Sequence, residues 1–187
     1  MRILIAGLLG AIAMFVWTSV AHLATPLATI GISQISDEAA ALPALDNSVG
    51  VQPGLYFFPW VDPKDPDMPA KTATLQKAHG HGLLIYSPAG VNIETSMVPM
   101  LIKEFIKQFV QALIAAAIVS MMIGATFLMR WGAVTLIGVS TGIATNVSYW
   151  NWYHFPLNYT LSQITIEVVS AMVAGLAIAW WLGRRAT

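Results

Sequence analysis

Four long apolar stretches constrain the fold of this 187-residue chain more than any other feature. They cover residues 3–23, 105–129, 131–147 and 161–182. A helix needs about 20 apolar residues to cross the hydrocarbon core of a bilayer. Because a helix satisfies its own backbone hydrogen bonds, it is the default spanning element in lipid. The sequence therefore predicts an all-α membrane protein with a bundle of four transmembrane helices.

The composition also favours a lipid environment. Hydrophobic residues make up 57% of the chain and charged residues only 10%, whereas soluble domains carry about 25% charged residues. Nine basic residues balance nine acidic ones, so no basic excess is available to bind nucleic acid. The absence of cysteine excludes disulfides and thiolate chemistry. We expect the lipid bilayer to be the main surroundings of this chain, and nothing in the sequence identifies a cofactor.

The first apolar stretch also has features of a secretory signal peptide. Arg2 precedes it, and small residues occur near Ala21. The segment from Ala21 to Ala24 lacks the spacing of small residues that precedes a cleavage site. We therefore expect residues 1–24 to form the first transmembrane helix, with a cleaved signal peptide as the alternative.

The basic residues next to the apolar stretches predict the orientation in the membrane. Basic residues mark the cytoplasmic side, and four spans place all of the following on one side: Arg2, Arg130, Arg184 and Arg185. Both termini are then cytoplasmic, whereas a large loop (residues 25–104) and an aromatic turn (residues 148–160) lie on the periplasmic side. The expected location is a bacterial cytoplasmic (inner) membrane.

The large loop is predicted to form a small α+β domain between the first two spans. Residues 55–58 and 83–86 each follow a glycine and precede a proline, which is typical of short strands. Residues 69–79 form a candidate helix. A further helix is expected to begin at residues 36–38 and to end near Pro43. Such a small segment buries little core, so we expect it to pack on the helix ends.

Small residues recur at every fourth position in the last three spans. This spacing lets two helix backbones approach closely, and association in lipid depends on such packing. One interpretation is a seam for a partner subunit, and the other is packing within the four-helix bundle. The positions are Ala112, Ala116, Ser120, Gly124, Gly138, Gly142, Ala171, Gly175 and Ala179.

Glu167 is the most informative single residue, because a carboxylate in lipid is costly and should point into the bundle. Gln163 lies one turn before it, and the expected partners on the second span are Lys107 and Gln111. One interpretation is a structural ion pair near the interface. The other is a site for a proton, an ion or a lipid headgroup.

The four histidines are candidates for a metal site. His22, His79, His81 and His154 are all expected on the outer side together with several methionines, and imidazole with thioether suits copper. Their spacing matches no recognised ligand geometry. Solvated or helix-ending histidines are the alternative.

The predicted outer turn is densely aromatic and includes Trp150, Trp152, Tyr153 and His154. Aromatic rings with a polar edge settle at the headgroup level, which indicates an interfacial belt. The alternative is a cleft for a lipid or quinone tail. No nucleophile–base arrangement and no phosphate-binding glycine motif accompanies it.

Three blocks of the sequence resemble a group of small bacterial membrane proteins with four spans. They are GLYFFP at residues 54–59, GLLIYSP at residues 82–88 and SYWNWYHFP at residues 148–156. That group has no assigned activity. The resemblance implies the four-span topology and a bacterial origin, and it implies no catalytic residue.

These observations give three functional hypotheses. The first is a non-enzymatic accessory or assembly subunit that packs against other membrane proteins or against itself. The second is a protein that binds a lipid or quinone tail, or a small membrane enzyme, which uses the aromatic turn together with Glu167. The third is handling of copper or another metal on the periplasmic face.

Overall fold

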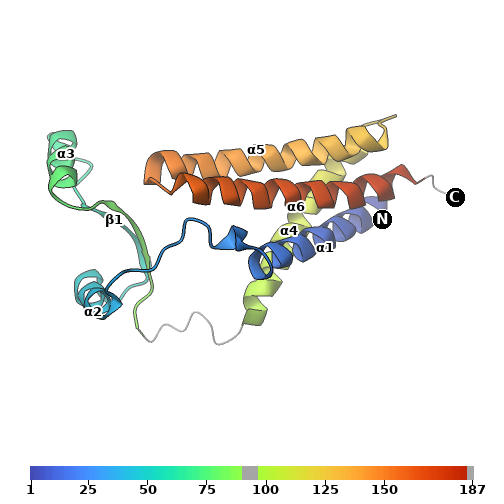
Figure 1. Cartoon of the computed structure of the whole chain (residues 1–187). Coiled ribbons are helices and arrows are strands. Elements are labelled where there is room, and N and C mark those ends of the chain that lie inside the picture. The colour runs from blue at the N-terminus through green and yellow to red at the C-terminus, as the bar shows by residue number, and fades with distance from the viewer. Residues whose placement is uncertain (90–96, 185–187) are drawn as a thin grey trace. The chain divides into compact units, whose positions relative to one another are not determined.

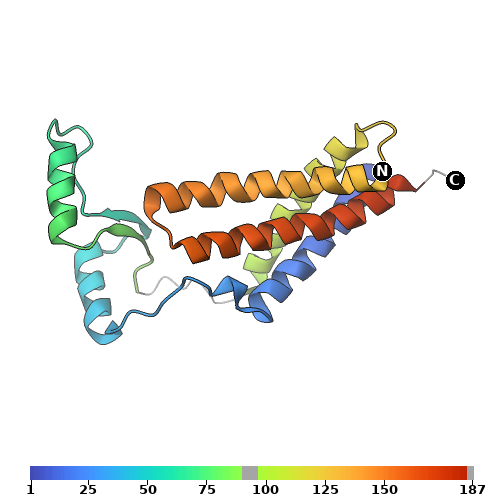
Figure 2. The same cartoon turned by 45° about the horizontal axis from the view of Figure 1, so that its top comes forward.

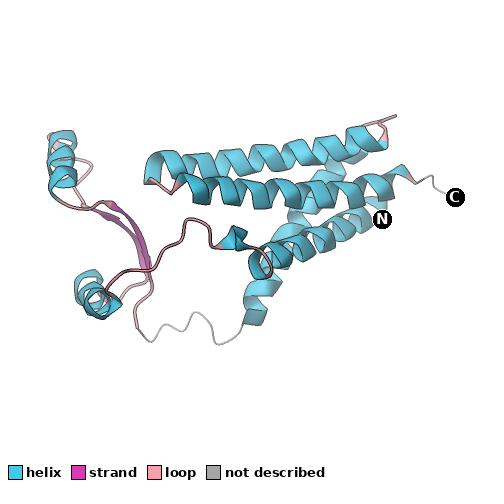
Figure 3. Ribbon diagram, in the orientation of Figure 1, coloured by secondary structure: helices cyan, strands magenta, loops and turns pink. Residues whose placement is uncertain are grey.

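The computed structural model describes residues 1–89 and 97–184, and this part of the chain is mostly helical (Figures 1 and 3). The helices are α1 (Arg2–Leu23), α2 (Glu38–Val49), α3 (Met68–Ala78), α4 (Met97–Ser120), α5 (Phe127–Tyr153) and α6 (Leu157–Gly183), with a short 3-10 helix, η1 (Pro26–Ala28). The strands are β1 (Gly54–Phe58) and β2 (Gly82–Tyr86). Contacts divide the chain into two units. We call Met1–Ile32 with Ser96–Thr187 the helical unit and Ser33–Thr95 the small unit.

Three helices of the described chain, α1, α5 and α6, are long and apolar enough to cross a bilayer, which supports a membrane protein. Helix α4 has 24 residues, which is long enough, but its residues are not apolar enough to make it a candidate span. Lys103, Glu104 and Lys107 interrupt its first half, and the helix ends at Ser120. The segment 105–129 predicted as a second span therefore differs from α4 at both ends.

The turn between α4 and α5 lies at residues 121–126 and not at Arg130 as predicted. Gly124 adopts a φ of +73°, a conformation that favours glycine. Thr126 caps α5, because its hydroxyl accepts a hydrogen bond from the backbone N–H of Met129 at 3.3 Å. Apolar residues before Gly124 hid this turn from the sequence analysis. Ser120 is exposed and the Cβ position of Gly124 faces open space, so neither packs against another helix of this chain.

The long helices pack in antiparallel pairs (Figures 1 and 2). Helix α1 lies against both α4 and α6, and α5 lies along α6. A Cβ atom at Gly138 would lie 2.1 Å from the Cβ of Ala171, so only glycine allows this close approach. The other predicted small positions, Ala112, Ala116, Gly142, Gly175 and Ala179, also lie in contacts between helices of this chain.

Three tryptophans link neighbouring helices through their indole N–H groups. Trp17 of α1 donates to the carbonyl of Ile166 at 3.0 Å, and Trp131 of α5 donates to that of Met172 at 3.0 Å. Trp181 of α6 donates to the carbonyl of Arg2 at 3.1 Å. Because backbone atoms accept all three bonds, they fix both the height and the rotation of α6 between its neighbours.

The small unit has a two-stranded antiparallel sheet and two helices. Strands β1 and β2 and helix α3 agree with the predictions for residues 55–58, 83–86 and 69–79. Helix α2 begins as predicted, with Asp37 as its cap, but it continues through Pro43 to Val49. The Tyr86 hydroxyl donates to the Asp46 carboxylate, and this bond raises the pKa of Tyr86 above its usual value. No described residue of this unit is fully buried.

We expect Gly138→Ala to destabilise the helical unit by about 1–3 kcal/mol, because the new methyl group overlaps Ala171. Gly132→Ala on the same helix is the matched control. No atom lies within 4 Å of its Cβ position, so the change should be neutral or stabilise by up to about 1 kcal/mol through helix propensity. Thermal unfolding in one detergent measures both variants.

The double variant Gly138→Ala/Ala171→Gly should recover much of the lost stability, because it restores the space between the helices. Equal unfolding temperatures for Gly138→Ala and Gly132→Ala would contradict the close contact.

Candidate functional site

A groove between α4 and α5 is the candidate site in the helical unit. The two helices meet near their connecting turn and diverge away from it (Figure 2), and a cavity of about 160 Å³ lies between them. Apolar side chains dominate its walls, and α1 and α6 form its floor. The lining residues are Met14, Gln111, Ala112, Ile114, Ala115, Val134, Ile137, Gly138, Thr141, Glu167, Ala171 and Ala174.

Glu167 lies in this groove at mid-height of α6. The helix has 27 residues, and Glu167 stands about 15 Å from its first residue and about 24 Å from its last at the usual rise per residue. A bilayer core is about 30 Å thick. If α6 crosses a bilayer, this carboxylate is therefore near the middle of the hydrocarbon layer and not near the interface.

No basic side chain among the described residues forms an ion pair with Glu167, and no hydrogen bond in this part of the chain reaches its carboxylate. Lys107, the expected partner, instead contacts Glu104 at 2.7 Å, one turn earlier on α4. Gln111 does line the same groove as Glu167. The structure therefore brings one of the two predicted partners to the site and not the other.

The helix contacts around Glu167 explain its position. The Cβ position of Gly142 on α5 is 3.6 Å from the Cβ of Glu167, so α5 covers the base of this side chain. The indole bonds of Trp17 and Trp131 to the backbone of α6 lie on either side of this level. Glu167 is thus held at the edge of the α5–α6 contact, where it lines the groove.

Gln108 is a buried polar residue that the sequence analysis missed. It is fully buried between α4 and α1. Its Nε2 donates to the Thr18 hydroxyl and to Glu104, both at 2.9 Å, while its Oε1 has no partner. The sequence did carry a signal for this contact, because Gln108 follows Glu104 by four residues and so lies on the same helix face. This network joins α1 to α4 and is separate from the groove.

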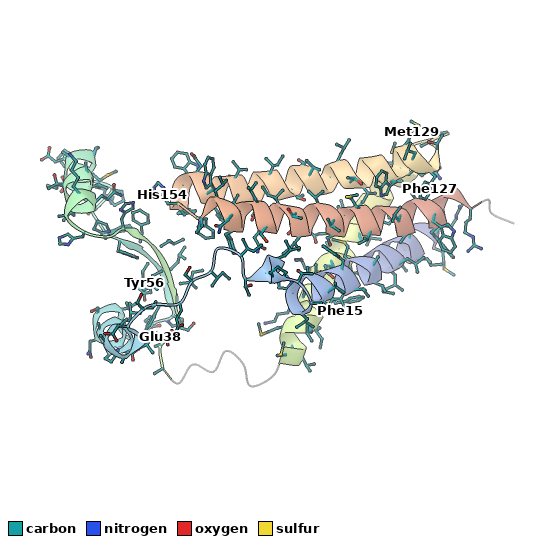
Figure 4. All side chains as sticks on the ribbon, in the orientation of Figure 1. Phe15, Glu38, Tyr56, Phe127, Met129 and His154 are labelled. Atoms are coloured by element: carbon teal, nitrogen blue, oxygen red, sulfur yellow. The ribbon has the colours of Figure 1, made fainter. Side chains whose placement is uncertain are left out.

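The aromatic segment differs from the predicted outer turn. Residues 148–153 are the end of α5, and residues 154–156 make the turn, which begins at His154 (Figure 4). The backbone of His154 is left-handed, with a φ of 57°. Tyr149 contacts the rings of Tyr153 and Phe155 at 6.0 and 5.3 Å between centroids. We call this the aromatic end of the helical unit.

The aromatic end and Glu167 do not form one site. Trp150 and Trp152 are exposed, and no residue of the turn lines the groove. Gln163, one turn nearer this end than Glu167, also lies outside the lining. The distance along α6 from Tyr159 to Glu167 is about 12 Å. The groove around Glu167 therefore does not include the aromatic turn that was predicted to act together with it.

The histidines are divided between the two units. His22 lies at the end of α1, and its Nδ1 is 2.8 Å from the carbonyl of Thr18. His154 belongs to the helical unit, whereas His79 and His81 belong to the small unit. Across residues 1–89 and 97–184, no three side chains of histidine, aspartate or glutamate lie close enough together to hold a metal ion.

Comparison with protein families, curated proteins and solved structures gives no significant match to this chain. The geometry of the groove and the chemistry of its residues therefore carry the functional argument.

We expect water to enter the groove of the isolated protein, because an unpaired carboxylate in lipid attracts water. In single-cysteine variants of this cysteine-free chain, Thr141→Cys in the groove should react several-fold faster with a small charged methanethiosulfonate than Ile143→Cys. Ile143 lies at nearly the same height of α5 but outside the lining. The rate of thiol modification in liposomes measures this difference, since the reactive thiolate forms only in a polar setting. Equal rates at the two positions would argue against a hydrated groove.

Proposed function

We propose that the protein is a non-enzymatic subunit of a membrane protein assembly, and that its α4–α5 groove receives a transmembrane helix of another subunit. One observation carries this proposal: the Glu167 carboxylate lines an apolar groove at mid-height of α6 without an ion pair or hydrogen bond among the described residues. A charged side chain in the middle of a bilayer costs about 2.5–3.5 kcal/mol or more. A basic residue on the incoming helix would offset this cost.

The same argument favours a different subunit over a second copy of this chain. The basic residues of α1 and α5 lie near the helix ends, and α6 contains none. Lys107 of α4 is nearest to the level of the groove, and it already contacts Glu104. We therefore propose a partner helix that is apolar except for one lysine, arginine or histidine near its middle.

We further propose that all four long helices cross a bacterial cytoplasmic membrane as a bundle. In this arrangement Lys103 and Lys107 extend toward the interface along the first half of α4. The helix ends near Arg2, Arg130 and Arg184 face the cytoplasm, because basic residues mark that side. The small unit then lies in the periplasm.

A second candidate function is binding of a lipid or quinone tail. The apolar walls of the groove, with the polar groups of Glu167, Gln111 and Thr141, favour a ligand that is mostly apolar with one hydrogen-bonding end. This ligand would occupy the same space as the partner helix, so the two functions are separable by what remains bound after mild purification.

Glu167→Gln tests the proposed assembly. We expect native mass spectrometry after mild-detergent purification to find a stoichiometric second subunit with the wild type and much less of it with Glu167→Gln. That subunit should carry a basic residue within a transmembrane helix, and replacing this residue should weaken the complex similarly. The isolated variant should unfold at the same or a higher temperature than wild type, because it no longer places a charge in lipid.

Glu38→Gln, which removes an exposed carboxylate of the small unit, is the control and should leave the complex intact. A wild-type protein that is repeatedly recovered as a ligand-free monomer would refute the proposed assembly. Recovery with a bound lipid or quinone and no protein would favour the second candidate.

The proposed orientation is testable with single cysteines. Lys77→Cys in the small unit should react with a membrane-impermeant maleimide in spheroplasts. Ile123→Cys, at a fully exposed position in the turn between α4 and α5, should react only after the membrane is permeabilised. Labelling of both positions, or of Ile123→Cys alone, in intact spheroplasts would overturn this topology.

A further inference from the structure

Three arginines from different parts of the chain converge on the last residues of α6. The Arg2 guanidinium donates to the carbonyl of Leu182 at 3.2 Å and also to that of Arg184. The Nη1 of Arg130 lies 3.6 Å from the Cβ position of Gly183. We call this the arginine end of the helical unit, and it lies opposite the aromatic end (Figures 1 and 4).

Two tryptophans hold the third arginine at this end. The guanidinium carbon of Arg184 lies 4.7 Å from the ring centroid of Trp180 and 5.6 Å from that of Trp181. Trp181 in turn donates to the backbone of Arg2. The guanidinium of Arg184 therefore rests on aromatic rings, a contact that leaves its N–H groups able to bind an anion.

The positive charge of this cluster is not neutralised within the described chain. None of the three arginines forms an ion pair there. The acidic residues of the sequence occupy positions 37–104 and 167, and Glu167 is about 24 Å from the end of α6. The guanidinium of Arg2 donates hydrogen bonds to carbonyls at the end of α6. The Nε of Arg130, in contrast, is buried and has no hydrogen-bond acceptor.

We propose that the arginine end binds a phosphate group through Arg130 and Arg184, with Arg2 holding the end of α6 in place. Planar guanidinium groups match the geometry of phosphate oxygens and bind them with two hydrogen bonds at a time. Tryptophans next to the cluster suit the headgroup level of a bilayer. The phosphate belongs either to an anionic phospholipid or to a free anion, and this site is independent of what occupies the groove.

The test measures binding to the purified full-length protein in a neutral detergent. Phosphatidylglycerol, phosphatidylcholine and inorganic phosphate are titrated separately, and native mass spectrometry and the unfolding temperature report binding. We expect phosphatidylglycerol to bind at least about tenfold more tightly than phosphatidylcholine, because the choline cation of phosphatidylcholine offsets the charge of its phosphate and is repelled by the arginines. Arg130→Gln and Arg184→Gln should each lose about tenfold in affinity.

Lys77→Gln removes a positive charge from α3 and should bind as the wild type does. Arg130→Lys keeps the charge but not the planar group, so it should recover part of the affinity and show that Arg130→Gln has not simply unfolded. Stabilisation by inorganic phosphate alone, lost in the same variants, supports the site and assigns it to a free anion. Binding of neither phosphate source, or equal losses in Lys77→Gln, would overturn the proposal.

Discussion

The close contact of α5 with α6 at Gly138 and Ala171 determines the rest of the helical unit. Because Gly138 has no side chain, the two backbones approach closely, and α5 packs against α6 along its length. Helix α5 cannot then also cover α4, which packs on α1 instead. The groove that contains Glu167 is the space left between these two pairs, so a single small residue links helix packing to the candidate site.

Much of this architecture could be predicted from hydropathy and spacing, and the failures have physical causes. The ends of α1 and α6 and both strands lie within a few residues of their predicted positions, because apolar runs and flanking glycines mark them directly. The turn before α5 was missed, since its residues are as apolar as a helix and only Gly124 and Thr126 signal it. Apolar length alone also misplaced the ends of α4, which includes Lys103 and Glu104 outside the predicted span.

The candidate site was predictable in part for a similar reason. A lone carboxylate in an apolar helix pointed to Glu167, and Gln111, one of its two expected partners, lines the same groove. The predicted ion pair between Glu167 and Lys107 is not formed. Glu104 lies one turn from Lys107 on the same helix, so these two residues pair without any contact between helices. Which of two nearby carboxylates pairs with a lysine depends on how the helices are rotated. The hydrogen bonds from tryptophan side chains to backbone carbonyls set this rotation, and they leave no pattern in the sequence.

Charge balance ties the two proposed sites together. The chain has no net charge, yet the carboxylate of Glu167 and the guanidinium groups of Arg130 and Arg184 all lack an oppositely charged partner in the described residues. They cannot neutralise each other, because about 24 Å of α6 separates their levels. An ion pair requires the charged nitrogen and oxygen atoms to lie within about 4 Å of each other. The proposed cation at mid-height and the proposed anion at the arginine end would therefore neutralise these charges separately.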